Sequence, residues 1–195
     1  MTVIILGIDP GAVATGFALT GHKPRQRLTL LASATVLRTK STQQLPVDPA
    51  YLHDVIDTCA QLTHSAERDA FSDKGTVAPI RIAIEGLTRP NWHMHGRAAA
   101  NPEPLLAAAI VLGNLQAWAV TTYGRYTEIP PGGNGSAILS QYPEPLVSDA
   151  ERRKPNWQMR IGETGKLRHE RSAFDVALTA SRQPLNTHTI NQGKR

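Results

Sequence analysis

The 195-residue sequence predicts an α/β fold in which helices flank a mixed five-stranded sheet. Three observations support this prediction. Short runs of apolar and β-branched residues come first, three in succession, which favours an antiparallel meander. Later strand-like runs alternate with segments whose apolar residues recur at helical spacing. Pro, Gly and Asp residues separate these segments, as expected at turns and helix starts. The predicted order is three strands, then helix, strand, helix, strand and helix.

The three leading strands are predicted from their residue types. Residues 2–9 (TVIILGID) form a nearly unbroken apolar run, typical of a central strand buried on both faces. Pro10-Gly11 then turns the chain, so residues 15–19 pair back on the first strand. Residues 28–37 (LTLLASATVL) form the third strand.

The first helix begins with Asp48 as its N-cap and Pro49 at its first position. A single apolar stripe at helical spacing follows, made of Leu52, Val55, Ile56, Cys59, Leu62 and Ala66. Residues 81–85 (RIAIE) are the fourth strand.

An Ala-rich helix is predicted from residue 101 to about residue 122, with Gly124 as its C-cap. Residues 126–129 form the fifth strand, which Pro130-Pro131 ends. The last predicted helix covers about residues 171–182.

A single domain is predicted over residues 1–183, with a polar tail at 184–195. A long basic loop is predicted at about 131–167, where Gly, Pro and polar residues show no periodicity. The basic excess lies late in the chain. Residues 151–195 hold ten Lys and Arg against four Asp and Glu, a net charge of +6, whereas residues 1–150 carry −1. This distribution favours contact with a polyanion, although a solvated basic tail would look the same.

Composition narrows the class of protein further. Cys59 is the only cysteine, which excludes an internal disulfide and a Cys-rich zinc site. No apolar run approaches the roughly 20 residues that span a bilayer, and the first residues lack the basic start of a signal peptide. We therefore expect a cytoplasmic protein that does not contact a membrane. The Gly-rich residues 130–135 lack the Gly-Lys-Ser/Thr ending of a nucleotide-binding loop, so no nucleotide cofactor is expected.

Three acidic residues stand in apolar surroundings. Asp9 and Glu85 each end an apolar strand, and Asp175 lies among small and apolar residues of the last helix. Each has an ordinary explanation on its own: Asp9 can open a turn, and Asp175 can pair with Arg171 one helical turn earlier. Together they predict a carboxylate cluster, and oxygen ligands favour Mg²⁺ or Mn²⁺ over zinc. Two such ions would clamp a scissile phosphate.

These residues stand in segments that resemble a known family. Residues 5–11 (ILGIDPG), residues 82–85 (IAIE) and residues 174–179 (FDVALT) are similar to the three acidic motifs of RuvC-type Holliday junction resolvases. The element order resembles the ribonuclease H-like core of that family over roughly 1–130 and 168–182. Residues 169–177 look most like resolvase-type proteins of actinobacterial phages, for which the compartment would be the host cytoplasm.

The resemblance implies a metal-dependent endonuclease that nicks branched DNA in recombination or repair. Asp9, Glu85 and Asp175 would be its metal-binding catalytic residues, with Mg²⁺ as cofactor and Mn²⁺ as a substitute. It also implies a homodimer, formed through the Ala-rich helix that contains Gly113, although a plain core helix would look much the same.

The sequence departs from the family at one position. The family carries a fourth acidic residue or a histidine three positions before the last aspartate, where this chain has Ser172, a poor metal ligand. His169 or Glu170 can take its place if the helix begins near Ser172 and the preceding loop folds inward. We favour His169 as the fourth catalytic residue, since a histidine can shuttle protons.

Basic and aromatic residues are candidates for DNA contact. Beside the acidic strand end, Trp92 could stack on an unpaired base, while Arg89 and Arg97 contact phosphate. His93 and His95 form only a weak metal motif. The basic residues of the late segment are interpreted as phosphate contacts, namely Arg152, Arg153, Lys154, Arg160, Lys166, Arg168 and Arg171.

Two other functions stay open on the sequence. An RNA-processing nuclease of the YqgF type shares the opening motif, and a catalytically inactive branched-DNA-binding module is consistent with Ser172. A sugar-kinase or actin-like ATPase needs two such domains, and 195 residues do not suffice for both.

Overall fold

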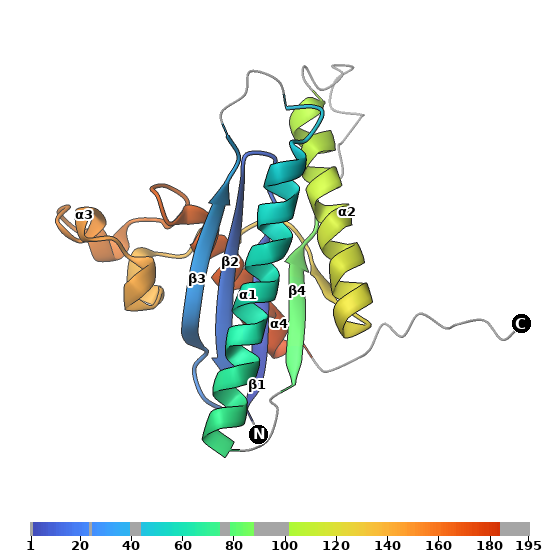
Figure 1. The fold of residues 1–195 in the computed structure, drawn as a ribbon. Helices are drawn as coiled ribbons and strands as arrows, with labels where there is room; N and C mark the ends of the chain where they lie inside the picture. Colours follow the sequence, from blue (N-terminus) through green and yellow to red (C-terminus); the bar gives the residue numbers. More distant parts are fainter. Residues whose placement is uncertain (1, 24, 40–43, 75–78, 88–101, 184–195) are drawn as a thin grey trace, which may run out of the picture.

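A computed structural model describes residues 2–23, 25–39, 44–74, 79–87 and 102–183, which form a five-stranded sheet with helices on both faces (Figure 1). The strands are β1 (Val3–Asp9), β2 (Ala14–His22), β3 (Thr29–Leu37), β4 (Ile80–Glu85) and β5 (Thr127–Ile129). Their order in the sheet is β3-β2-β1-β4-β5. β2 is antiparallel to both β1 and β3, whereas β4 runs parallel to β1 and β5 parallel to β4. The predicted fold class is confirmed.

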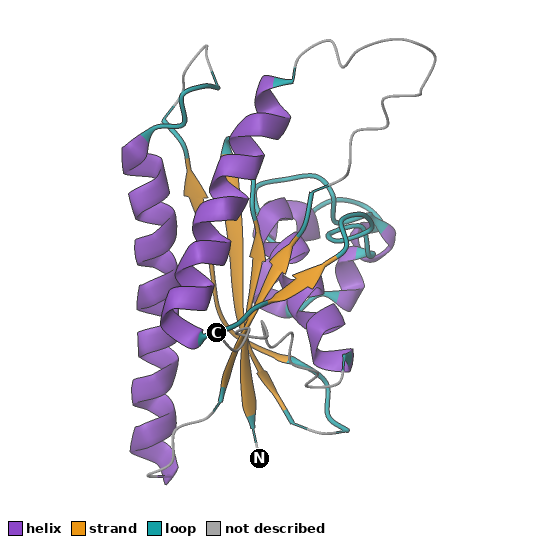
Figure 2. Cartoon of the chain, turned by 90° about the vertical axis from the view of Figure 1, so that its right-hand side faces the viewer, coloured by secondary structure: helices purple, strands orange, loops and turns teal. Residues whose placement is uncertain are grey.

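The helices form two layers around the sheet (Figure 2). α1 (Pro49–Lys74) and α2 (Glu103–Tyr123) cover one face, where α1 contacts β3 and α2 contacts β4. α4 (Arg168–Arg182) covers the opposite face, against β1 and β2. β1 is buried between the layers, as its apolar sequence predicted.

The start of α1 and the end of α2 match the sequence prediction, whereas α2 begins at Glu103, after Pro102 as N-cap, and not at residue 101. The Asp48 carboxylate accepts a hydrogen bond from the backbone N–H of Ala50 at 3.0 Å, and α1 starts at Pro49. The predicted stripe of α1 faces the core, with Val55 and Cys59 fully buried. α2 ends at the predicted C-cap, Gly124.

α2 is long and apolar enough to cross a membrane by length and composition alone, which the sequence analysis did not foresee. Core helices of soluble proteins can have the same length and apolar composition. One face of α2 packs into the main core through buried residues that include Val111 and Leu115.

α4 begins at Arg168, three residues before the predicted start at residue 171. Its N-cap is Leu167, whose side chain makes no capping hydrogen bond, so the sequence held no start signal there. α4 also lies very close to the sheet: a Cβ placed on Gly16 would stand 2.2 Å from the backbone oxygen of His169. A glycine at this position of β2 therefore allows the first turn of α4 to approach the strand.

Residues 130–167, called the insertion below, connect β5 to α4 and are more structured than the predicted loop. They contain the short helices η1 (Leu139–Gln141), η2 (Glu144–Leu146), α3 (Asp149–Arg152) and η3 (Trp157–Met159). Ser148 caps α3, because its hydroxyl accepts from the backbone N–H of Glu151 and the Glu151 carboxylate accepts from the N–H of Ser148. Leu139 and Leu146 of the insertion pack against Phe174 of α4, forming a small separate core.

Candidate active site at the carboxyl ends of β1 and β4

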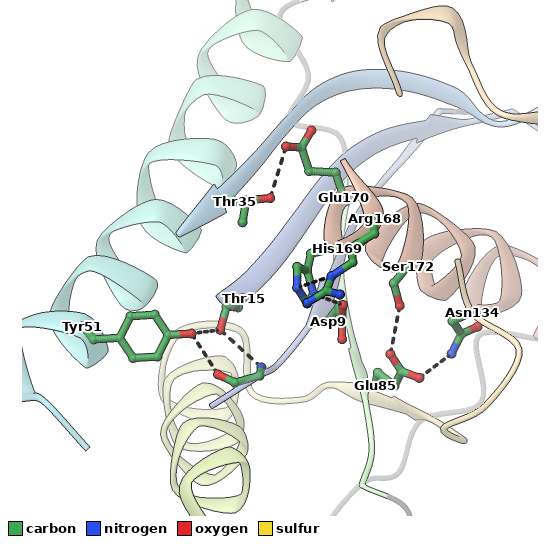
Figure 3. Close-up of polar contacts among 11 residues, drawn as sticks. Asp9, Thr15, Thr35, Tyr51, Glu85, Asn134, Arg168, His169, Glu170 and Ser172 are labelled. Carbon is green, nitrogen blue, oxygen red and sulfur yellow. Dashed lines mark hydrogen bonds and ion pairs between the residues drawn. The ribbon is translucent and has the colours of Figure 1, made fainter. Parts of the chain in front are cut away.

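Asp9 and Glu85 lie side by side because the two strands that they end are parallel neighbours (Figure 3). Ile8 pairs with Ile84 in the sheet, so the residue after each stands at the same edge. Burial raises the pKa of the Glu85 carboxyl, and the negative charge of Asp9 raises it further. The two carboxylates thus repel each other in a half-buried setting, a condition that a cation would relieve.

Asp175 reaches this edge from α4 and is held by two hydrogen bonds. Its Oδ2 accepts from the Tyr142 hydroxyl at 2.7 Å and from the backbone N–H of Gly135 at 2.8 Å. Burial raises the pKa of Asp175, although both hydrogen bonds act to lower it. The alternative pairing of Asp175 with Arg171 is wrong, because Arg171 pairs with Glu151 instead.

The Gly-rich start of the insertion contacts both Glu85 and Asp175. The side-chain amide of Asn134 donates to Glu85 Oε1 at 2.9 Å, and the backbone N–H of Gly132 donates to the same oxygen at 3.4 Å. Gly135, which donates to Asp175, has a φ of 79°, in the left-handed region that favours glycine.

The contacts of this Gly-rich segment with Glu85 and Asp175 were not predicted, because residues 130–135 were considered only as a nucleotide-binding loop, a role that their sequence excludes. A signal was present: the segment follows β5, and the carboxyl ends of parallel β4 and β5 meet at one edge of the sheet.

His169 stands beside Asp9 at the start of α4 (Figure 3), with its Nδ1 3.0 Å from Asp9 Oδ2. Arg168 donates its Nε hydrogen to His169 Nε2 at 3.0 Å. Because Nε2 accepts this bond, the ring hydrogen sits on Nδ1, which donates to Asp9. The His169 ring is thus oriented by the Arg168 guanidinium on one side and the Asp9 carboxylate on the other.

The other two candidates for the fourth position lie elsewhere. Glu170 turns to β3, where its carboxylate accepts hydrogen bonds from Ser33 at 2.6 Å and Thr35 at 3.1 Å. Ser172 faces the site, and its hydroxyl donates to Glu85 Oε2 at 3.2 Å. The structure therefore brings His169 and Ser172 to the carboxylates and keeps Glu170 away. The sequence interpretation placed His169 in a loop folded inward before the helix. In the structure His169 lies within α4 itself.

The turn after Asp9 is tied to α1. The Tyr51 hydroxyl donates to the Gly11 carbonyl at 2.8 Å and lies 2.8 Å from the Thr15 hydroxyl. Burial raises the pKa of Tyr51 to about 12, so it remains a neutral donor. This contact fixes the turn that carries Asp9.

The donor set suits a divalent cation in chemistry, although the carboxylates are not gathered around one point. Among the residues that the structure describes, no three His, Cys, Asp or Glu side chains form a group that could hold a metal ion. Asp9 and Glu85 nevertheless end neighbouring parallel strands, and Asp175 is linked to Glu85 through the adjacent residues Asn134 and Gly135. All-oxygen donors of this kind fit Mg²⁺ or Mn²⁺.

Arg171 is not a phosphate contact, which corrects the sequence interpretation. Its side chain is fully buried and forms an ion pair with Glu151 at 3.0 Å. Its guanidinium also donates to three carbonyls of the insertion, those of Leu146, Gly162 and Thr164. Arg171 therefore joins the insertion to α4.

The remaining basic candidates divide into three groups. Arg152 is paired with Glu144 at 2.7 Å. Exposed cations lie at Arg153, Lys154, Arg160, Lys166 and Arg168. Arg89, Trp92, His93, His95 and Arg97 lie outside the described residues.

Comparison with known proteins gives a fold but no sequence family. No protein-family model matches the chain, and no curated protein matches it. The structure of Thermus thermophilus RuvC in complex with a Holliday junction substrate is similar with a TM-score of 0.53 and 15% sequence identity, covering 91% of this chain and 92% of that one. Another Thermus thermophilus RuvC structure gives a TM-score of 0.48 at 18% identity, covering 92% of each chain. An Aquifex aeolicus PPX-GPPA enzyme gives 0.38 at 12% identity, over 69% of this chain and 38% of that one. The chain has the ribonuclease H-like fold of RuvC.

Proposed function

We propose that this chain is a metal-dependent endonuclease that nicks four-way (Holliday) or other branched DNA by phosphodiester hydrolysis. One observation carries the proposal: Asp9 of β1 and Glu85 of β4 stand together at one edge of the sheet (Figure 3), in a fold similar to that of RuvC. Asp175 of α4 is linked to Glu85 by the Gly-rich segment, whose Asn134 binds Glu85 and whose Gly135 binds Asp175. Carboxylates at this edge are costly to bury unless a cation or a reacting group requires them.

Asp9, Glu85 and Asp175 would hold the cation, Mg²⁺ or its substitute Mn²⁺. When bound, two such ions would supply Lewis-acid polarisation of the phosphate and an ionised water. His169 would move a proton at its Nε2, which is freed when a DNA phosphate takes up the guanidinium of Arg168. Asp9 keeps the imidazole oriented for this role through Nδ1.

Branched DNA is proposed as the substrate on two grounds. The similar T. thermophilus RuvC structure is a complex with a Holliday junction substrate. Exposed cations of the insertion, among them Arg153, Lys154 and Lys166, form no ion pair within the described part of the chain. They are free to neutralise phosphates without reading sequence.

We also propose a homodimer, formed through the uncovered face of α2. Leu106 and Ile110, one helical turn apart, are 50% and 40% exposed, and Gly113 lies exposed beside them. Apolar side chains together with a glycine allow a second helix to approach closely. Ile110→Lys should convert the dimer to a monomer in sedimentation equilibrium, and wild-type protein that is monomeric at micromolar concentration would contradict this arrangement.

The test is cleavage of a labelled synthetic four-way junction, a matched linear duplex and an RNA–DNA hybrid, each with Mg²⁺, Mn²⁺ or EDTA. We expect metal-dependent paired nicks in the junction, absent from Asp9→Asn. Tight junction binding without cleavage would indicate an inactive binding module. Ser172 at the fourth position and carboxylates that do not gather around one point would be consistent with that outcome. Preferential cutting of the RNA strand would place the chain with YqgF-type RNA nucleases.

A further inference from the structure

Tyr142 is the residue of the insertion that reaches the candidate active site. Its side chain is buried, 7% exposed, and its ring packs edge-on against Phe174 with centroids 6.3 Å apart. The Arg171 guanidinium lies over the same ring, 5.9 Å from its centroid. The hydroxyl emerges from this apolar setting to donate to Asp175 Oδ2 at 2.7 Å. The contact is therefore made by a side chain with little freedom to move.

We propose that Tyr142 is a positioning residue that orients Asp175 for cation binding. The proposal rests on the metal-dependent function proposed above. Tyr142 and the backbone N–H of Gly135 both donate to Oδ2, and within the described residues Oδ1 accepts no hydrogen bond. Two donors on one oxygen fix the plane of the carboxylate and leave the other oxygen available to a cation.

The insertion is built so that this hydroxyl stays in place. Arg171 of α4 donates to the carbonyls of Leu146 and Gly162, and Leu146 packs in the same small core as Tyr142. A Cβ on Gly162 would come within 2.8 Å of the Tyr142 ring, so the backbone of the insertion closes tightly over it. The buried pair of Arg171 and Glu151 holds both segments against α4.

The hydrogen bond of the Tyr142 hydroxyl indicates that this residue does more than fill the core. A tyrosine that only filled the small core of Leu139, Leu146 and Phe174 would not require its hydroxyl, and phenylalanine would serve equally well. Here the hydroxyl is directed at a single carboxylate oxygen. Removing it should therefore alter cation binding more than folding.

The experiment is a Mn²⁺ titration of the full chain followed by electron paramagnetic resonance. Tyr142→Phe should weaken Mn²⁺ binding about tenfold or more, the usual effect of losing a hydrogen bond to a metal ligand. Tyr126→Phe is the matched control, since Tyr126 is a half-buried tyrosine beside the main core, and it should bind Mn²⁺ as the wild type does. Asp175→Asn should weaken binding at least as much as Tyr142→Phe.

A pair of tyrosine-sized replacements separates the hydroxyl from the ring. With p-aminophenylalanine at position 142 a donor is restored, so Mn²⁺ affinity should return toward the wild-type value. With p-methylphenylalanine there is no donor, and affinity should stay low at a similar unfolding midpoint. If Tyr142→Phe does not fold, the p-aminophenylalanine variant still tests the proposal, because it keeps a donor: Mn²⁺ affinity near the wild-type value supports it, and low affinity in the folded variant overturns it.

The outcomes distinguish the two proposals. Wild-type Mn²⁺ affinity in Tyr142→Phe, together with weakened binding in Asp175→Asn, would overturn the role of Tyr142 and leave the metal site intact. Equal affinity of the amino and methyl variants would overturn it as well. Unchanged binding in Asp175→Asn would instead remove the proposed metal site on which the inference rests.

Discussion

Replacing Arg171 with Met should destabilise the protein strongly. The exposed charges available to DNA should stay almost the same, because the Arg171 side chain is buried. The guanidinium is fully buried and pairs with Glu151, which is itself 8% exposed. Removing one partner of such a pair leaves an uncompensated charge, which costs about 3–5 kcal/mol. For a chain of this size, about 2–4 °C of melting temperature is lost per kcal/mol, so we expect a fall of about 6–20 °C.

Urea unfolding measures this loss directly. Arg153→Met is the matched control, because Arg153 is exposed and should change the free energy of unfolding by about 0.5 kcal/mol or less. The double variant Arg171→Met/Glu151→Gln should lose less than the sum of the two single variants, since the residues are in contact. If Arg171→Met loses under about 1 kcal/mol but binds DNA more weakly, Arg171 is a phosphate contact and the structural assignment is refuted.

The difference in unfolding free energy between the wild type and Arg171→Met should depend on pH. Burial of Glu151 acts to raise its pKa, but hydrogen bonds from Arg171 and Ser148 outweigh burial and lower it below the usual range. A depressed pKa in the folded state stabilises the protein above the unfolded-state pKa of about 4.3, and that stability is lost as pH falls through the folded-state value. The gap between wild type and Arg171→Met should therefore narrow in acid below about pH 4.

Three further predictions follow from the site. Gly16→Ala should cost about 1–3 kcal/mol in urea unfolding, because its Cβ would meet a backbone oxygen of α4 at 2.2 Å. Gly21→Ala in the same strand is the control and should cost little, because its Cβ would meet only side-chain atoms of Leu31, the nearest at 3.7 Å. Burial raises the pKa of Glu85, and the hydrogen bond from Asn134 acts to lower it. Asn134→Ala removes that bond, so the acidic limb of the pH–rate profile for cleavage should move to higher pH. An unmoved limb would show that Glu85 does not titrate in the reaction. Arg153→Ala should reduce the slope of log affinity for a junction against log salt by about 1, and an unchanged slope would remove Arg153 from the phosphate contacts.

Local patterns predicted the fold well where one element carried its own signal. The apolar run ending in Asp9 forms β1, and Asp48 caps α1, because burial and capping act within a few residues. The start of α4 was placed three residues late, since Leu167 offers no side-chain cap. Packing of α4 on the sheet, permitted at Gly16, determines where that helix begins.

The candidate site could be predicted only in part, because some of its contacts depend on tertiary structure. The juxtaposition of Asp9 and Glu85 follows from two parallel strands and was accessible from the sequence. The donors to Asp175 were not, since Tyr142 lies 33 residues away in a segment without periodicity. The same limit explains the error at Arg171: a basic residue in a basic segment looks like a phosphate contact until the fold buries it against Glu151.

Asp9, Glu85 and Asp175 are proposed to act as one cation-binding unit. The rate of Mg²⁺-dependent junction cleavage in single and double variants tests this proposal most directly. Asp9→Asn and Asp175→Asn should each abolish nearly all cleavage, and the double variant should be no slower than either, because residues that act as a unit are not additive. Nearly wild-type cleavage in either single variant, or losses that multiply in the double variant, would contradict a shared site.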